Sequence, residues 1–199
     1  MVTNTCQNGV VEHAFPCGNA ALDFVGTLRA RRNAVPLEKL RAPRNLDAWF
    51  RESGVGEVEP ASTQADLDRA VALREAIYDL IATRLAGRDY DEHALALVND
   101  AARQPPTVPQ LDAAGKPVRA GAEAATSTVA RDAIDILGGP DGALLKECHR
   151  PECTQVFIDR SRGFRREWCA MKTCGNRVKG ATYRARQRGN LPMSTTTQP

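Results

Sequence analysis

Residues 148–174 read CHRPECTQVFIDRSRGFRREWCAMKTC, and they decide how the C-terminal part of this chain folds. Two close cysteine pairs, Cys148-x4-Cys153 and Cys169-x4-Cys174, are separated by a loop of fifteen residues. Zinc takes four ligands at the corners of a tetrahedron, and two such pairs supply them. Because four sulfur ligands leave no open coordination position, the spacing predicts one structural Zn²⁺ per chain.

The same cysteines are compatible with two other chemistries. Two disulfides would require an oxidising compartment, and an iron–sulfur cluster also uses four thiolates. Clustered thiols in a reducing cytosol favour metal ligation, and two well-separated pairs suit a single ion. The remaining cysteines, Cys6 and Cys17, lie outside this cluster and are expected to be ordinary thiols.

The residues between the two pairs predict a short strand and a basic loop. Residues 154–159 alternate around two apolar positions, as a strand does. The loop follows at residues 160–166 and offers Phe164 as an exposed aromatic side chain. Trp168 is expected to pack over the metal site rather than to stack on a base.

A helix is expected from about residue 173 to residue 188. At about 100° per residue, one face of this helix should turn toward the metal and the core, and it consists of Cys174, Val178, Ala181 and Ala185. Gly175, beside a ligand, is expected to allow close backbone packing. Asn176 can either cap the helix or contact a base edge, and the cap is the favoured interpretation.

The positive charge of the chain is concentrated around the cysteines. The whole chain carries +3, whereas residues 148–188 hold eleven lysines and arginines against three acids, a net of +8. Cations on a loop and on both flanks of a helix suit the phosphates of a nucleic-acid backbone. The residues expected to contact nucleic acid are Arg160, Arg162, Arg165, Arg166, Lys172, Arg177, Lys179, Arg184, Arg186 and Arg188.

The segment that precedes the cysteines is expected to be a helical domain. Apolar periodicity and capping residues predict helices over residues 19–28, 45–53, 64–85, 91–103 and 128–137. Trp49 and Phe50 are the expected core anchors, and residues 108–118 are expected to form a small β-hairpin. The fold class is therefore mainly α, with a small α+β zinc module at the end. The expected divisions are residues 1–139, 140–190 and a disordered tail at 191–199.

No catalytic set is evident in this helical segment. His13 and His93 lie 80 residues apart, and no G-x-S-x-G, Walker or H-E-x-x-H pattern is present. The chain is therefore not expected to be an enzyme. Asp23 lies within an apolar run and is a candidate for a buried hydrogen-bonding group or a ligand contact.

The composition is that of an ordinary globular chain, with 42% hydrophobic residues. No apolar run approaches the roughly 20 residues of a membrane-spanning helix. The N-terminus lacks the basic start and apolar block of a secretory signal. A cytoplasmic location and no membrane partner are the expectations.

Two stretches resemble known families. WCAMKTCGNR (residues 168–177), preceded by FIDRSR (157–162), resembles the bacterial CGNR zinc finger, whose first half is matched by Cys148-x4-Cys153. GNAALDFVGT (residues 18–27) resembles the opening of the ABATE domain that usually precedes this finger, although Gly26 stands where an Asn is usual.

The resemblance implies a stress-induced transcriptional regulator with a treble-clef-like finger that binds DNA. It also implies that the preceding domain senses a small-molecule effector or mediates contacts. DNA-binding regulators are often two-fold dimers, so a homodimer is a further expectation. Two alternatives stay open: an RNA-binding protein, and a zinc-stabilised scaffold for another protein that binds no nucleic acid.

Overall fold

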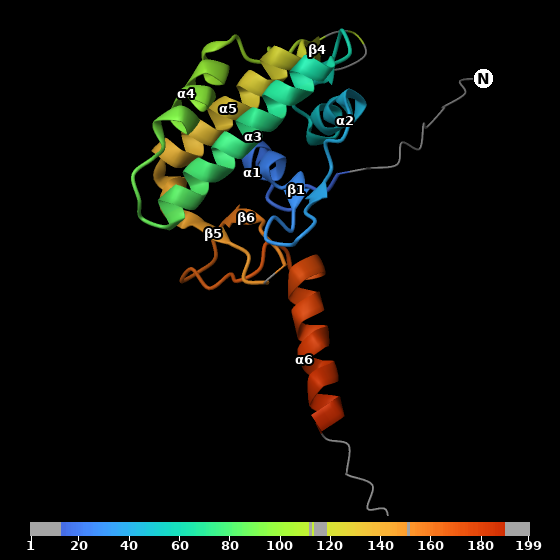
Figure 1. Cartoon of the computed structure of the whole chain (residues 1–199), viewed down its shortest axis with the longest axis vertical. Helices are drawn as coiled ribbons and strands as arrows, with labels where there is room; N and C mark the ends of the chain where they lie inside the picture. The colour runs from blue at the N-terminus through green and yellow to red at the C-terminus, as the bar shows by residue number, and fades with distance from the viewer. Residues whose placement is uncertain (1–12, 112, 114–118, 151, 190–199) are drawn as a thin grey trace, which may run out of the picture.

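The computed structural model describes residues 13–111, 113, 119–150 and 152–189. Five helices form the body: α1 (Ala20–Val25), α2 (Pro43–Ser53), α3 (Gln64–Leu85), α4 (Glu92–Arg103) and α5 (Ala122–Gly138). Helices α3, α4 and α5 pack on one another, and α1 lies against α3 and α5 (Figure 1). None of the described helices combines the length and apolar character that crossing a membrane requires. The predicted tail at 191–199 and Cys6 lie outside the described residues.

Local capping chemistry explains where several helices begin and end. Helix α3 covers the predicted range because Thr63 and Asp66 each accept the other's backbone N–H, at 3.2 and 2.8 Å. Helix α2 ends at Gly54, whose φ of 78° suits glycine. It begins at Pro43 rather than Asn45, since proline is favoured in the first helical turn.

Two further predicted helices, α1 and α5, also differ in length from the observed ones. Helix α1 ends at Val25 instead of residue 28, because the chain turns at Gly26 into a short strand. Helix α5 begins at Ala122 rather than at residue 128. The added turns are rich in alanine, a strong helix former, whereas the prediction followed only the apolar residues that come later.

Three short strand pairs complete the fold. The strands are β1 (Leu28–Arg29), β2 (Leu37–Glu38), β3 (Glu57–Val58), β4 (Arg119–Ala120), β5 (Leu145–Glu147) and β6 (Val156–Ile158). Strands β1–β2 and β5–β6 are antiparallel, and β3–β4 is parallel. Most of the hairpin predicted over 108–118 lies outside the described residues, and residues 108–111 contain no strand.

The core of the body is centred on aromatic side chains. Trp49, Phe50 and Phe24 are fully buried, and the rings of Trp49 and Phe24 lie 4.8 Å apart. Trp49 and Phe50 are therefore the core anchors that the sequence predicted. Val156 and Ile158 of β6 belong to the same buried cluster, so the β5–β6 pair packs directly against the helical body.

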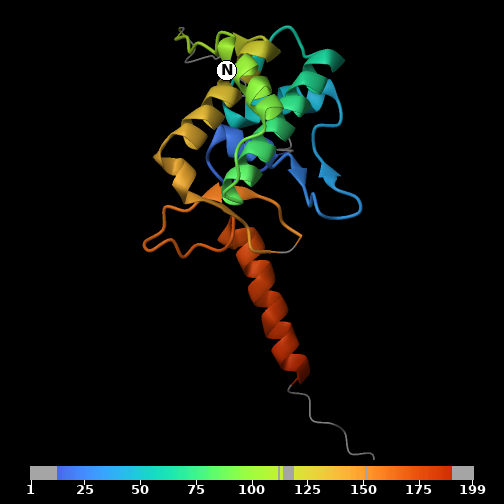
Figure 2. The same cartoon turned by 60° about the vertical axis from the view of Figure 1, so that its left-hand side comes forward.

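The last helix, α6 (Asn176–Gly189), leaves the body. Figures 1 and 2 show it projecting away from the β5–β6 pair in both views. Beyond the π-helical turn that precedes it, α6 has no extensive contact with any other described element. Among the described residues, the helix is therefore attached to the rest of the protein mainly at its N-terminal end.

Candidate zinc centre and basic helix

Four cysteines from two segments of the chain converge next to the body: one pair lies between β5 and β6, and the other lies just before α6. Cys148 follows β5 and Cys153 precedes β6, so the first pair closes the turn of this strand pair. Cys169 follows the basic loop, and Cys174 lies in the π-helical turn Met171–Gly175 that leads into α6. The four Sγ atoms lie within 4.8 Å of one another. A strand pair followed by a helix, with one cysteine pair at each, is the treble-clef-like arrangement that the sequence predicted.

The sulfur–sulfur distances match a tetrahedral zinc site. Zn–S bonds of about 2.3 Å place neighbouring sulfurs about 3.8 Å apart. The Cys169–Cys174 distance is 3.6 Å and the Cys153–Cys169 distance is 3.9 Å. A disulfide would need about 2.05 Å, and all four thiols are free. The cluster fits one structural zinc ion.

The ionisation of the thiols also favours a bound cation. The hydrogen bond between Cys153 and Cys169 lowers the pKa of Cys153 to about 5. The same bond, followed by burial, raises the pKa of Cys169, and burial raises that of Cys148. Four thiolates this close repel one another. Zn²⁺ replaces the protons of the four thiols, and its positive charge offsets this repulsion.

The sequence around the cysteines is adapted to close packing. A Cβ on Gly175 would lie 2.5 Å from the Met171 Sδ and 3.2 Å from the Trp168 Cδ1, so these two side chains pack closely over the glycine. Trp168 packs against the buried cysteines. The expectation for Trp168 is confirmed, whereas the close neighbours of Gly175 are side chains rather than backbone.

Sequence reasoning missed two positive side chains in this module. Arg150 places its Nη1 at 3.6 Å from the Cys174 Sγ and its Nε at 2.9 Å from Glu152. Lys146 donates to the buried carboxylate of Asp159 at 2.6 Å and to the Phe164 carbonyl. A lysine before the first cysteine and an acid after the strand were the available signals, but neither falls within a recognised ligand pattern.

Asp159 organises the basic loop. Its side chain is fully buried, and it accepts the backbone N–H groups of Ser161 at 2.9 Å and of Arg166 at 3.1 Å. Burial alone would raise the pKa of Asp159, but the Lys146 ion pair and these hydrogen bonds outweigh it and hold the pKa well below its usual range. The two ends of the loop are therefore fastened to one carboxylate.

Replacing Asp159 with Asn is expected to lower the thermal unfolding midpoint of the zinc-loaded protein at pH 7. A depressed pKa means that the stabilisation is complete above about pH 4 and is lost as the pH falls through the lower folded value. At neutral pH the substitution therefore removes the full contribution of the ionised group. Glu167→Gln removes an exposed acid from the same module and serves as the control. Equal midpoints for both variants would contradict this role of Asp159.

Helix α6 differs from expectation in its apolar face. Cys174 is buried and Val178 is half-buried, but Ala181 and Ala185 are exposed because the helix leaves the body (Figure 2). Asn176 does not cap the helix either, since the π-helical turn begins five residues earlier with Ala170 at its N-cap. The prediction of a core-facing stripe was wrong beyond the first turn.

The basic residues of α6 are accessible. Arg177, Lys179, Arg184 and Arg186 are all exposed. Lys172, Asn176, Arg177 and Arg184 line one shallow hollow at the start of the helix. Lys179 lines another together with the loop residues Arg162 and Arg165. The side chain of Arg188 lies outside the part of the chain that is described.

The basic loop contains side chains of two kinds. Arg162 and Arg165 are exposed, and Phe164 is 57% exposed, as expected for this aromatic. Arg166 is engaged within the module: its Nε donates to the Trp168 carbonyl at 2.9 Å, and its guanidinium lies 4.4 Å from the ring of Phe157. Arg160 pairs with Asp141 at 2.5 Å.

One glutamine and one thiol add polar contacts between the cysteine module and the body to the apolar packing of β6. Gln155 donates from Nε2 to the Leu22 carbonyl at 3.0 Å, and its side chain fills the space where a Cβ on Gly26 would stand. The Cys17 thiol donates to the Val156 carbonyl at 3.0 Å. Burial, and then the nearby Asp23, raise the pKa of Cys17 and keep it a donor.

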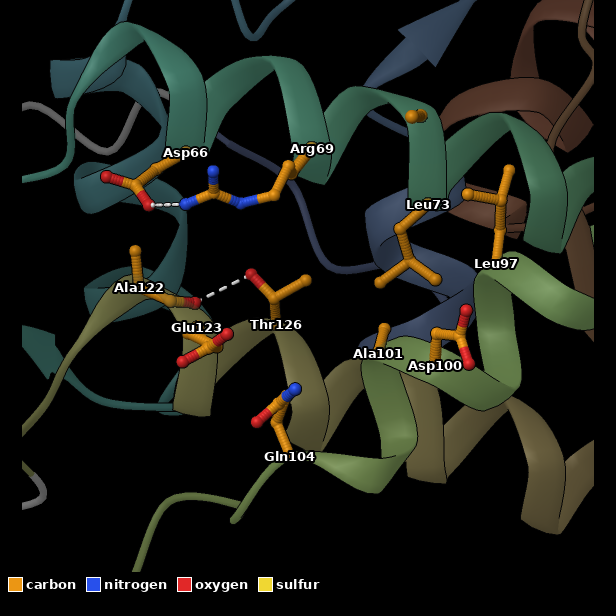
Figure 3. A pocket seen from close by; sticks show the side chains of 11 residues that line it. Asp66, Arg69, Leu73, Leu97, Asp100, Ala101, Gln104, Ala122, Glu123 and Thr126 are labelled. Carbon is orange, nitrogen blue, oxygen red and sulfur yellow. Dashed lines mark hydrogen bonds and ion pairs between the residues drawn. The ribbon is translucent and has the colours of Figure 1, made fainter.

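A mainly apolar cavity lies among α3, α4 and α5. It has a volume of about 260 Å³, and Figure 3 shows Leu73, Leu97 and Ala101 at one end. At the other end, Arg69 points to Asp66, with which it pairs at 2.6 Å (Figure 3). Of the charged residues around this cavity, Asp66 and Arg69 pair with each other and Asp100 pairs with Arg103 at 2.7 Å.

Comparison with known proteins gives two matches. Residues 18–140 match the ABATE family, described as a "Putative stress-induced transcription regulator", and residues 145–187 match the CGNR zinc finger. A search of curated proteins finds no significant match. The first match covers more than half of the chain, and the second contains all four clustered cysteines.

Proposed function

Because the chain belongs to the ABATE family and carries a CGNR zinc finger, we propose that it is a zinc-dependent, DNA-binding transcriptional regulator. The observation that carries the proposal is α6, a projecting helix with four exposed basic side chains whose first turn is anchored at the cysteine cluster. The zinc supplies a rigid base for this helix, because Cys169 and Cys174 both lie within seven residues before its first residue, Asn176.

The dimensions of α6 suit the major groove of DNA. Its fourteen residues span about 21 Å, and a helix about 10–12 Å across enters a groove about 12 Å wide. The seven-residue spacing places Arg177 and Arg184 within about 20° of each other around the axis, and Lys179 about 160° away from Arg177. Two rows of cations on opposite sides of one helix suit the two phosphate backbones that border the groove.

A polar face lies between these two rows. Asn176, Tyr183 and Gln187 fall on it by their spacing, and all three are exposed. The Gln187 Nε2 lies 3.2 Å from the Tyr183 hydroxyl. Asparagine and glutamine amides match the donor and acceptor pattern of adenine in the major groove. We assign base contacts to this face and phosphate contacts to the cationic rows.

The arginines of the loop extend the proposed phosphate contacts. Arg162, Arg165 and Lys179 line a common hollow, which places loop and helix cations where one strand of the duplex would pass. Lys172 lines the other hollow with Arg177 and Arg184, whereas Arg160 pairs with Asp141 and lines neither. Arg166 acts mainly by holding the loop. A homodimer on a palindromic site would extend this arrangement by two-fold symmetry. Sedimentation with and without DNA measures the oligomeric state.

The choice of nucleic acid is tested by competition. Zinc-loaded full-length protein is expected to bind mixed-sequence duplex DNA more tightly than a structured RNA hairpin or a single strand of equal length, because the helix needs a wide major groove that A-form RNA does not offer. Fluorescence anisotropy at one fixed salt concentration measures this order. Tighter RNA binding would favour an RNA-binding protein. Absence of all binding by fully zinc-loaded protein would favour a scaffold for another protein.

A further inference from the structure

The body contains a second cavity, and two buried ring nitrogens of its lining residues lack a hydrogen-bond partner among the described residues. It has a volume of about 210 Å³, which corresponds to about seven water molecules in the liquid. It is open to one side and lined by His13, Asp23, Thr27, Arg29, Lys39 and Trp49, with Ala14 and Gly26. Asp23 and Gly26 come from the family-like segment at residues 18–27, so this segment forms part of the cavity wall.

Two ring nitrogens beside this cavity lack a hydrogen-bond partner. Trp49 is fully buried, and its indole Nε1 finds no acceptor among the residues described. His13 is about nine-tenths buried and places Nδ1 at 3.0 Å from Glu52 Oε2, while its Nε2 has no partner within the same residues. Buried N–H groups are nearly always paired in folded proteins. The Trp49 indole N–H can only donate, so a ligand atom that accepts a hydrogen bond would pair it.

The charges around the cavity favour an anion. Arg29 and Lys39 are half-buried, and within the described part of the chain neither forms an ion pair. The one acid of the lining, Asp23, is already satisfied: its Oδ1 accepts the Cys17 N–H at 3.0 Å and its Oδ2 accepts the Asn19 N–H at 3.3 Å. Two unpaired cations beside one satisfied carboxylate suit a ligand with a single anionic group.

We propose that this cavity binds a small oxyanion, a carboxylate or phosphate group on a compact metabolite. Its oxygens accept the Trp49 indole N–H and pair with Arg29 and Lys39.

The cavity also lies next to the contact between body and finger. Gly26 packs against Gln155, and Asp23 holds the backbone of Cys17, whose thiol donates to Val156. A ligand that shifts either wall residue therefore acts on the strand that carries the finger. A proposed effector site therefore lies next to the module to which we assign DNA binding, separated from it by a single side chain.

The binding of oxyanions is tested on the indole N–H resonances of the zinc-loaded full-length protein. Sodium phosphate and sodium acetate are titrated separately to tens of millimolar at constant ionic strength, with chloride as the reference. The Trp49 resonance is expected to move downfield and to saturate with at least one of the two anions. The Trp168 resonance reports separately on the basic hollow that this residue lines with Arg162 and Arg165. Saturation with phosphate alone identifies a phosphate ligand, and saturation with acetate alone identifies a carboxylate. Trp168→Phe assigns the two resonances.

Two variants separate specific binding from general charge effects. Lys39→Met is expected to weaken the anion affinity about tenfold or more, because a charge-assisted contact is lost. Arg88→Met removes an exposed cation elsewhere on the body and should leave the affinity unchanged. A Trp49 resonance that does not saturate with either anion would overturn the proposal, as would an equal loss in both variants.

Discussion

Replacing Cys174 with Ser is expected to abolish zinc binding and to unfold the basic loop, the π-helical turn and α6. A hydroxyl is a poor zinc ligand at neutral pH, and three thiolates without a fourth do not close the tetrahedron. Structural zinc contributes about 10–16 kcal/mol to the folding of small zinc modules. Apart from the cysteines, the buried cluster that this module has for itself contains only Phe157 and, at its edge, Trp168. The metal is therefore the main source of its stability.

The unfolding caused by the loss of zinc should not extend into the helical body. Helices α3, α4 and α5 pack on one another away from the cysteines (Figure 1), so most helical signal is expected to remain in circular dichroism. Zinc content measured by mass spectrometry of the purified protein gives the direct readout. Cys17→Ser is the matched control, because Cys17 is a thiol outside the cluster and its replacement should leave one zinc per chain. A Cys174→Ser protein that keeps one zinc and an ordered α6 would contradict the ligand assignment.

Replacing both Arg177 and Arg184 with Ala is expected to weaken duplex DNA binding about a hundredfold at low salt. Each residue is assigned one phosphate, and each lost phosphate contact weakens binding uniformly across sequences and reduces the salt slope by about 1. Both side chains are exposed, so zinc content and the unfolding midpoint should not change. Anisotropy titrations at two salt concentrations measure both effects.

The matched control for this pair is Arg44→Ala with Arg88→Ala. Both arginines are exposed on the body, away from α6, and their removal lowers the net charge by the same amount. Equal losses of affinity in the two double variants would mean that total charge, and not α6, governs binding. Loss of zinc from the α6 variant would instead show that its arginines support the finger.

The sequence was sufficient where the determinants are local. The four cysteines fall within 27 residues, and metal geometry alone relates them. Helix α3 was predicted to the residue because its start depends on Thr63 and Asp66, which are neighbours in the chain. The same holds for Gly175, whose need for close packing comes from Met171 and Trp168.

The sequence was not sufficient to predict which elements pack against each other. The periodicity of α6 predicts an apolar face but does not predict which element packs against that face. No described element covers Ala181 or Ala185. The contact between Gln155 and Leu22 joins residues 133 positions apart. Asp23 was recognised as a candidate ligand contact, but Trp49, His13 and Lys39 reach the same cavity only through the fold.

The central claim, that α6 binds DNA from a zinc-anchored base, is tested most directly by a salt series on the full-length protein with one zinc per chain. Anisotropy with a duplex DNA should give a logarithm of the association constant that falls linearly with the logarithm of the salt concentration. Four phosphate contacts from Arg177, Lys179, Arg184 and Arg186 predict a slope of about −4, and loop contacts make it steeper. A fully zinc-loaded protein that fails to bind duplex DNA at low salt, or binds it with no dependence on salt, would contradict the claim.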